Sequence, residues 1–308
     1  MFGRRPALLL LISIVFAAAF AVAGCGDSKS NDAPVELEDT LGFSREGQME
    51  LQSRVENEIA TCMKGQGFDY VPVDPFAQQQ ALTGKARLTD EDFVKEFGYG
   101  ISTLFGRGNT QADPNERIRS SLGAADQAAY DRALGGDNPG ATFSEAIDSG
   151  DFSELGGCTK EATDKAFGGT ALLTSLVGKL DELDERIVQD QRMVNATEKW
   201  SVCMKDQGFS YEEPDAIDED LTRRFKAIAG SGTRPGATKP ADSGVKVDQA
   251  ALTNLQREEV KIANADTDCE KKEITPVERQ VRPQYEKQFR QQNQSLLARV
   301  KKPNASGQ

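Results

Sequence analysis

The sequence of 308 residues contains no histidine, and this absence excludes several kinds of active site. Without an imidazole the chain cannot form a Ser-His-Asp triad, a Cys-His pair or a histidine-ligated zinc centre. It also has no P-loop, no GxGxxG turn between a strand and a helix, and no EF-hand loop. We therefore expect no cofactor and no metal, and the sequence singles out no catalytic residue.

Basic residues are scarce beside acidic ones, with 37 Lys and Arg against 49 Asp and Glu and a net charge of −12. Nucleic-acid binding depends on Lys and Arg that neutralise phosphates, so nucleic acid is not an expected partner. The many carboxylates leave one catalytic class open, because a glycosidase needs only two of them.

Two groups of these acidic residues attract attention, and both have a structural interpretation. One group falls at predicted helix starts, where the helix dipole favours acidic side chains. The other falls inside a predicted helix, where charged residues are typical of a solvated face. The first group is Asp90, Asp92, Asp218 and Asp220, and the second is Glu258, Glu259 and Asp266.

The N-terminus has the pattern of an exported lipoprotein. Arg4 and Arg5 precede an apolar run over residues 7–23, which ends in Val22-Ala23-Gly24-Cys25. This ending resembles a bacterial lipobox, whose cysteine is diacylated before a signal peptidase cuts in front of it. The small residues, the placed cysteine and the polar continuation favour this interpretation over a transmembrane anchor.

We therefore expect residues 1–24 to be a removed signal peptide. Cys25 would then be the lipidated N-terminus on the extracytoplasmic face of the cell membrane. Cleavage would leave 284 residues and, with Arg4 and Arg5 gone, a net charge of −14. Such an acidic surface disfavours lying flat on anionic lipid, so attachment should depend on the acyl chains of Cys25. Residues 25–40 are polar and predict a flexible tether.

A seven-residue motif, Cys-Met-Lys-x-Gln-Gly-Phe, occurs at residues 62–68 and again at 203–209. Each copy follows apolar residues at helical spacing. The glycine of each copy is expected just past the end of a helix, where a left-handed backbone costs glycine little. The following phenylalanine can then fold back onto the methionine, so the motif predicts a Schellman-type helix stop twice.

The chain as a whole predicts a mainly α fold with at most short β pieces. Because the motif recurs, we expect tandem helical units at residues 41–169 and 170–308. A mobile insert rich in Gly and Pro is expected at about 229–245. Thr275-Pro276-Val277-Glu278 predicts the start of the last helix with a capping box.

Four cysteines remain beside Cys25, and four cysteines allow three pairings. The repeated motif favours one bridge inside each unit, which pairs Cys62 with Cys158 and Cys203 with Cys269. An exported protein can keep such bridges. Four free thiols are the alternative, and zinc is disfavoured because none of these cysteines has CxxC spacing.

Three stretches together resemble a group of uncharacterised actinobacterial secreted lipoproteins. They are Gly98-Tyr99-Gly100-Ile101-Ser102-Thr103, Trp200-x-x-Cys203-Met204-x-x-x-Gly208-Phe209 and Val260-Lys261-Ile262-Ala263-Asn264-Ala265-Asp266-x-x-Cys269. The resemblance covers most of the chain in patches and departs from it in the insert at 229–245. It implies a cell-envelope setting and no assigned activity.

Three functions are compatible with these features. The first is a non-catalytic binding or accessory protein of the envelope, held to the membrane through Cys25 and partnered by an envelope protein or peptidoglycan. The second is a cell-wall glycan hydrolase, which requires two carboxylates with a raised pKa in a cleft with aromatic walls. The third is a solute-binding lipoprotein of a transporter, whose two lobes usually alternate β and α segments. The sequence favours them in that order.

Overall fold

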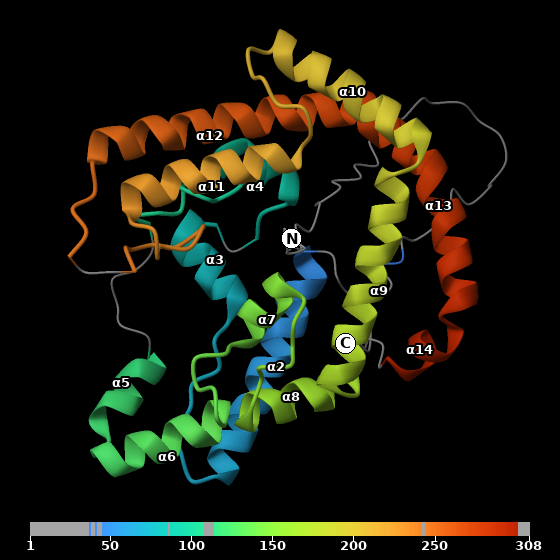
Figure 1. The fold of residues 1–308 in the computed structure, drawn as a ribbon. Coiled ribbons are helices and arrows are strands. Elements are labelled where there is room, and N and C mark those ends of the chain that lie inside the picture. Colours follow the sequence, from blue (N-terminus) through green and yellow to red (C-terminus); the bar gives the residue numbers. More distant parts are fainter. Residues whose placement is uncertain are drawn as a thin grey trace, which may run out of the picture.

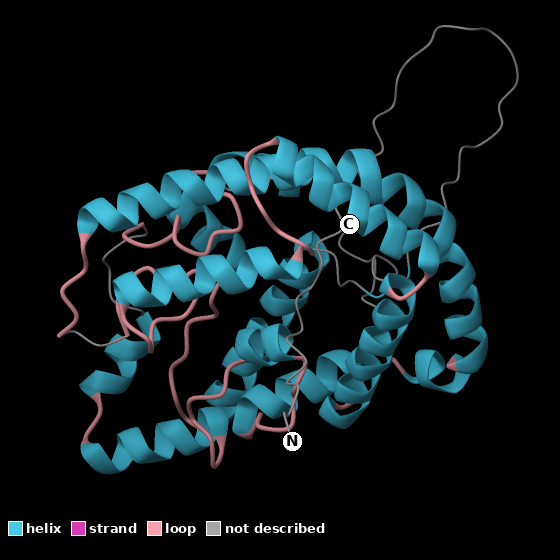
Figure 2. Cartoon of the chain, turned by 45° about the horizontal axis from the view of Figure 1, so that its top comes forward, coloured by secondary structure: helices cyan, strands magenta, loops and turns pink. Residues whose placement is uncertain are grey.

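The computed structural model describes residues 37, 41, 45–85, 87–107, 114–241 and 244–300. Every regular element in these residues is a helix, which confirms the mainly α fold (Figures 1 and 2). None of the helices in these ranges is both long and apolar enough to cross a membrane. The predicted signal peptide and the lipidation site Cys25 lie outside the described residues, as does nearly all of the tether.

Most of the helices follow one another closely, with longer connections between α4 and α5 and between α11 and α12. In chain order they are α2 Arg45–Gly65, α3 Pro75–Thr83, α4 Asp90–Phe97, α5 Pro114–Ser121, α6 Ala124–Gly135, α7 Phe143–Ser149 and α8 Gly157–Phe167. They continue with α9 Thr170–Val188, α10 Gln191–Asp206, α11 Asp215–Ala229, α12 Gln249–Cys269, the π-turn η1 Glu270–Ile274, α13 Thr275–Gln292 and α14 Gln294–Arg299.

Three apolar cores hold these helices together. The first lies among α2, α6, α7 and α8 and contains Met63, Tyr130 and Phe152. The second lies among α10, α11 and α12, with the turn that follows α4 packed into it through Ile101 and Phe105. The third joins α9 to α13. Figure 1 shows α12 and α13 as one long bent path, with α10 and the end of α9 beside the bend. The start of α9 lies next to α8, which packs against α2.

Both copies of the repeated motif end their helices as predicted. In the first copy the amide of Phe68 donates to the carbonyl of Met63 at 3.0 Å, and Gly67 has a φ of +87°. In the second copy the amide of Phe209 donates to the carbonyl of Met204 at 2.9 Å, and Gly208 has a φ of +92°. This six-to-one bond across a left-handed glycine defines the Schellman stop.

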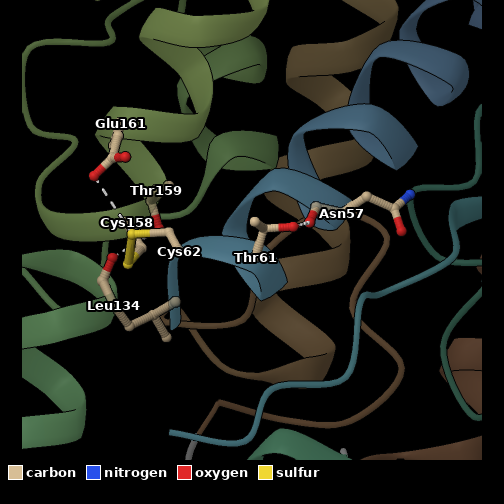
Figure 3. The surroundings of a disulfide bond; sticks show 7 residues. All are labelled: Asn57, Thr61, Cys62, Leu134, Cys158, Thr159 and Glu161. Atoms are coloured by element: carbon tan, nitrogen blue, oxygen red, sulfur yellow. Dashed lines mark hydrogen bonds between the residues drawn. A yellow bond between two sulfur atoms is a disulfide. The ribbon is translucent and has the colours of Figure 1, made fainter. Parts of the chain in front are cut away.

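The cysteines pair as the sequence predicts, with one disulfide between Cys62 and Cys158 and another between Cys203 and Cys269. Figure 3 shows the first bridge joining the end of α2 to the start of α8, where the hydroxyl of Thr159 donates to the carbonyl of Leu134. Each bridge lies at the edge of one apolar core. One of its cysteines, Cys158 or Cys269, is buried in the core, and the other, Cys62 or Cys203, is only partly buried.

The predicted capping box at Thr275 is wrong. The chain runs on from α12 through η1 into α13, and Thr275 makes no side-chain cap. Pro276 has no amide hydrogen to donate to an α-helical partner, and the wider π-turn accommodates this gap. Glu278 does not reach back to a cap but pairs with Arg282 one turn later.

The apolar cores do not follow the predicted division between residues 169 and 170. The turn at residues 98–107 comes from the first predicted unit and packs in the second core, against α11 and α12. Beyond Ala229, where α11 ends, the described part of the insert at 229–245 contains no helix, and it hydrogen-bonds to the same turn. There the amide of Gly236 donates to the carbonyl of Ile101, and the amide of Gly106 donates to that of Thr238, both at 3.0 Å. The tandem repeat stays a prediction.

Candidate functional site

The three stretches that carry the family resemblance meet in the second core. Asp266 of α12 accepts hydrogen bonds from the hydroxyl of Tyr99 at 2.7 Å and from the indole nitrogen of Trp200 at 2.8 Å. Trp200 is fully buried, and the Cys203–Cys269 disulfide lies in the same core. Burial raises the pKa of Asp266 to about 6, although both hydrogen bonds oppose the rise.

Glu259 holds the turn after α4 against α12. Its carboxylate is fully buried and accepts from the amides of Ile101 at 2.7 Å and Ser102 at 2.8 Å and from the Ser102 hydroxyl at 2.6 Å. Gly98 lies so close that an added Cβ would meet the Glu259 backbone at 3.2 Å, and its φ of +62° also favours glycine. Glu259 and Asp266 have their hydrogen-bond partners within the fold, so we assign them a structural role.

The predicted solvated face of α12 is therefore wrong for Glu259 and Asp266. Only Glu258 fits it, with a half-exposed side chain that pairs with Arg224. The sequence contained a signal, because Glu259 and Asp266 continue the buried stripe of α12 at spacings of three and four. The stripe is Leu252, Leu255, Glu259, Ile262, Asp266 and Cys269.

Three of the four acidic residues at the predicted helix starts lie in the first turn of a helix, where the helix dipole favours them. Thr89 caps α4 by accepting from the amide of Asp92 at 3.1 Å, and Asp90 and Asp92 occupy the first turn. Asp218 lies in the first turn of α11, whereas Asp220 lies further along and pairs with Arg224 at 3.2 Å. These four residues belong to two different helices and do not line a common cavity among those described.

The strongest candidate for a functional site is an acidic cavity of about 440 Å³. It lies between the end of α9, the start of α10, the segment before α11, η1 and the start of α13. Its size is within the usual range of ligand sites, roughly 300–1,000 Å³. Seven carboxylates and one basic side chain line it; the carboxylates are Asp184, Glu198, Glu212, Glu213, Asp215, Glu270 and Glu278, and the basic residue is Arg282.

The turn between α9 and α10 shapes one wall of the acidic cavity. Asp190 caps α10 by accepting from the amide of Arg192 at 2.9 Å, and the Tyr285 hydroxyl of α13 donates to it at 3.2 Å. The bonds from Arg192 lower the pKa of Asp190. The charged cap therefore stabilises the start of α10, and the bond from Tyr285 links this turn to α13.

Arg282 neutralises only part of this negative charge. Its guanidinium lies 2.7 Å from the carboxylate of the buried Glu278 and 3.1 Å from that of Asp184. Burial nevertheless raises the pKa of Asp184. Burial also raises the pKa of Asp215, and the nearby Glu219 adds to the rise.

Glu270 is the least compensated carboxylate of the acidic cavity. It lies mostly within the protein with part of its surface on the cavity, and no described side chain hydrogen-bonds or ion-pairs with it. Burial raises its pKa well above the ordinary value, and the neighbouring carboxylates of Asp266 and Glu278 raise it further. A cation beside Glu270 would oppose both effects and would favour the ionised carboxylate.

The apolar part of the lining of the acidic cavity is aliphatic. Ile187 and Met193 are buried, whereas Val188 and Val194 are 45% and 37% exposed. These two valines are half of the large hydrophobic residues that are exposed in the described part of the chain. No aromatic residue lines the cavity. Within the described ranges, no group of three or more Asp, Glu or Cys residues is placed to hold a metal ion.

Sequence reasoning missed the acidic cavity because five separate segments build it. The signal that was present is the local excess of acidic residues at 212–219, which the sequence alone could not place beside η1. Comparison of the chain with known protein families, with curated proteins and with solved structures finds no match.

Proposed function

We propose that the protein is a lipid-anchored, extracytoplasmic binding or accessory protein of the bacterial cell envelope, which takes its ligand in the acidic cavity without chemical turnover. The observation that carries this proposal is the uncompensated Glu270 on a cavity of ligand size. The lipobox at Val22-Ala23-Gly24-Cys25 supports the anchor, and the polar residues 25–40 supply a tether that would hold the folded domain off the membrane.

The glycan hydrolase ranks below this function. Raised pKa values at Glu270 and Asp215 meet one of its requirements, but the walls of the acidic cavity are aliphatic where a sugar ring would stack on aromatic faces. The transporter-type solute-binding protein ranks third, because the described residues form helices where that class alternates strands and helices.

Photo-crosslinking in the producing bacterium tests binding at the acidic cavity. A photoreactive amino acid would replace Val194, which lines the cavity, and in a control strain Val71, which is 44% exposed and lies outside it. We expect a discrete adduct on the peptide that contains residue 194, identified by its mass, and none at residue 71. Equal labelling at both positions, or none at either, would contradict the proposal.

Substituting the anchor cysteine tests the location. Cys25→Ala should abolish incorporation of labelled palmitate. Because the signal peptidase cuts only in front of a diacylated cysteine, the variant should also keep its signal peptide and have a correspondingly larger mass. Ser30→Ala, in the tether, is the control and should stay membrane-bound and labelled. If Cys25→Ala is labelled like the unaltered protein, the lipoprotein assignment is wrong.

A further inference from the structure

We infer that the acidic cavity binds a linear aliphatic diamine or polyamine, with one ammonium group at Glu270 and the alkyl chain against the valine-lined wall. This inference rests on the proposed function, and it names the chemical class of the ligand. It is drawn from the charge of the cavity lining, the aliphatic side chains in that lining, and the lack of an internal partner for Glu270.

The charge of the lining selects a cation. Seven carboxylates face one guanidinium, and that guanidinium is already paired with Glu278 and Asp184. A partly buried carboxylate is stabilised when an opposite charge comes within about 4–6 Å. An ammonium beside Glu270 would supply that charge through a charge-assisted hydrogen bond.

The distribution of charge favours a ligand with more than one ammonium group. Glu278 is buried and Glu270 is partly buried, whereas four other carboxylates of the lining are exposed. The exposed carboxylates are Glu198, Glu212, Glu213 and Asp215. A ligand with a positive group at each end can pair with a buried and an exposed carboxylate at the same time.

The apolar wall selects an aliphatic chain between those groups. Ile187, Met193 and Val194 supply methyl and thioether surface beside the carboxylates. Each methylene that leaves water against such a wall makes binding more favourable. A bare metal ion would gain nothing there, and the described carboxylates offer no cluster of three or more suited to one.

Calorimetric titration of the full-length protein in a non-ionic detergent tests this inference. The probes are 1,5-diaminopentane and spermidine, with 1,5-pentanediol as the uncharged chain and Mg²⁺ as the bare cation. We expect saturable binding of both amines at one site and no binding of the diol. Glu270→Gln should weaken amine binding at least tenfold. Glu50→Gln removes the same charge from an exposed position of α2 outside the acidic cavity, and it should leave the affinity unchanged.

Three results would overturn the inference. They are a lack of saturable amine binding, equal weakening by both substitutions, and displacement of the amines by equimolar Mg²⁺. If the amines fail to bind while residue 194 still gives a discrete adduct in cells, the ligand class is wrong and the binding function stands. If both experiments fail, the proposed function fails too.

Discussion

Replacing Cys203 and Cys269 together by alanine should lower the free energy of unfolding by about 4–5 kcal/mol. The two cysteines are separated by 66 residues, and in the chain-entropy model a loop of that length constrains the unfolded chain by roughly this amount. Replacing Cys62 and Cys158, which are separated by 96 residues, should have a similar effect. Since the whole stability of a domain is of order 5–15 kcal/mol, either pair decides whether the protein stays folded when heated.

Urea unfolding followed by circular dichroism measures this change, with the same variants compared under oxidising and reducing conditions. Val202→Ala alters an exposed neighbour of Cys203 and should change the stability by less than about 0.5 kcal/mol. An unaltered protein whose unfolding midpoint is the same with and without reductant would show that the bridges contribute nothing to stability.

Removing the carboxylate of Glu259 should cost roughly 3 kcal/mol or more, because each buried donor that loses its acceptor costs about 1–3 kcal/mol. Glu259→Ala leaves three donors from Ile101 and Ser102 without an acceptor inside the protein. It also opens a space where a fully buried side chain was. The turn at residues 98–107 should detach from α12 before the rest of the fold does.

The neighbouring Glu258 provides a matched control. Its side chain is 44% exposed and pairs with Arg224, so Glu258→Ala should cost at most about 1 kcal/mol. Hydrogen exchange of the amides of Ile101 and Ser102 should rise steeply in Glu259→Ala and little in Glu258→Ala. Equal exchange in the two variants would mean that Glu259 does not hold the turn.

Local features of this fold were predictable from the sequence. The helix stops at Gly67 and Gly208 follow from backbone preferences within a few residues. The cysteine pairing is not local, but it could be predicted because one motif with a cysteine occurs twice. Glu259 and Asp266 were misjudged because charged side chains were assumed to be solvated, although their spacing put them on the buried stripe of α12.

Other features depend on contacts that no local pattern reveals. Glu278 has the position of a capping residue, yet it pairs with Arg282 because α13 continues from η1 without a break. The acidic cavity joins residues as far apart in the chain as Asp184 and Arg282. The excess of carboxylates over basic side chains in its lining can be seen only when α9, η1 and α13 are placed together.

The most direct test of the acidic cavity as a ligand site is a crystal structure of the protein grown with 1,5-diaminopentane. The account predicts ligand density in the cavity, with one nitrogen within hydrogen-bonding distance of the Glu270 carboxylate and the chain along Val194. An empty cavity in which a lysine or arginine of the protein itself pairs with Glu270 would contradict it, because the carboxylate would then need no ligand.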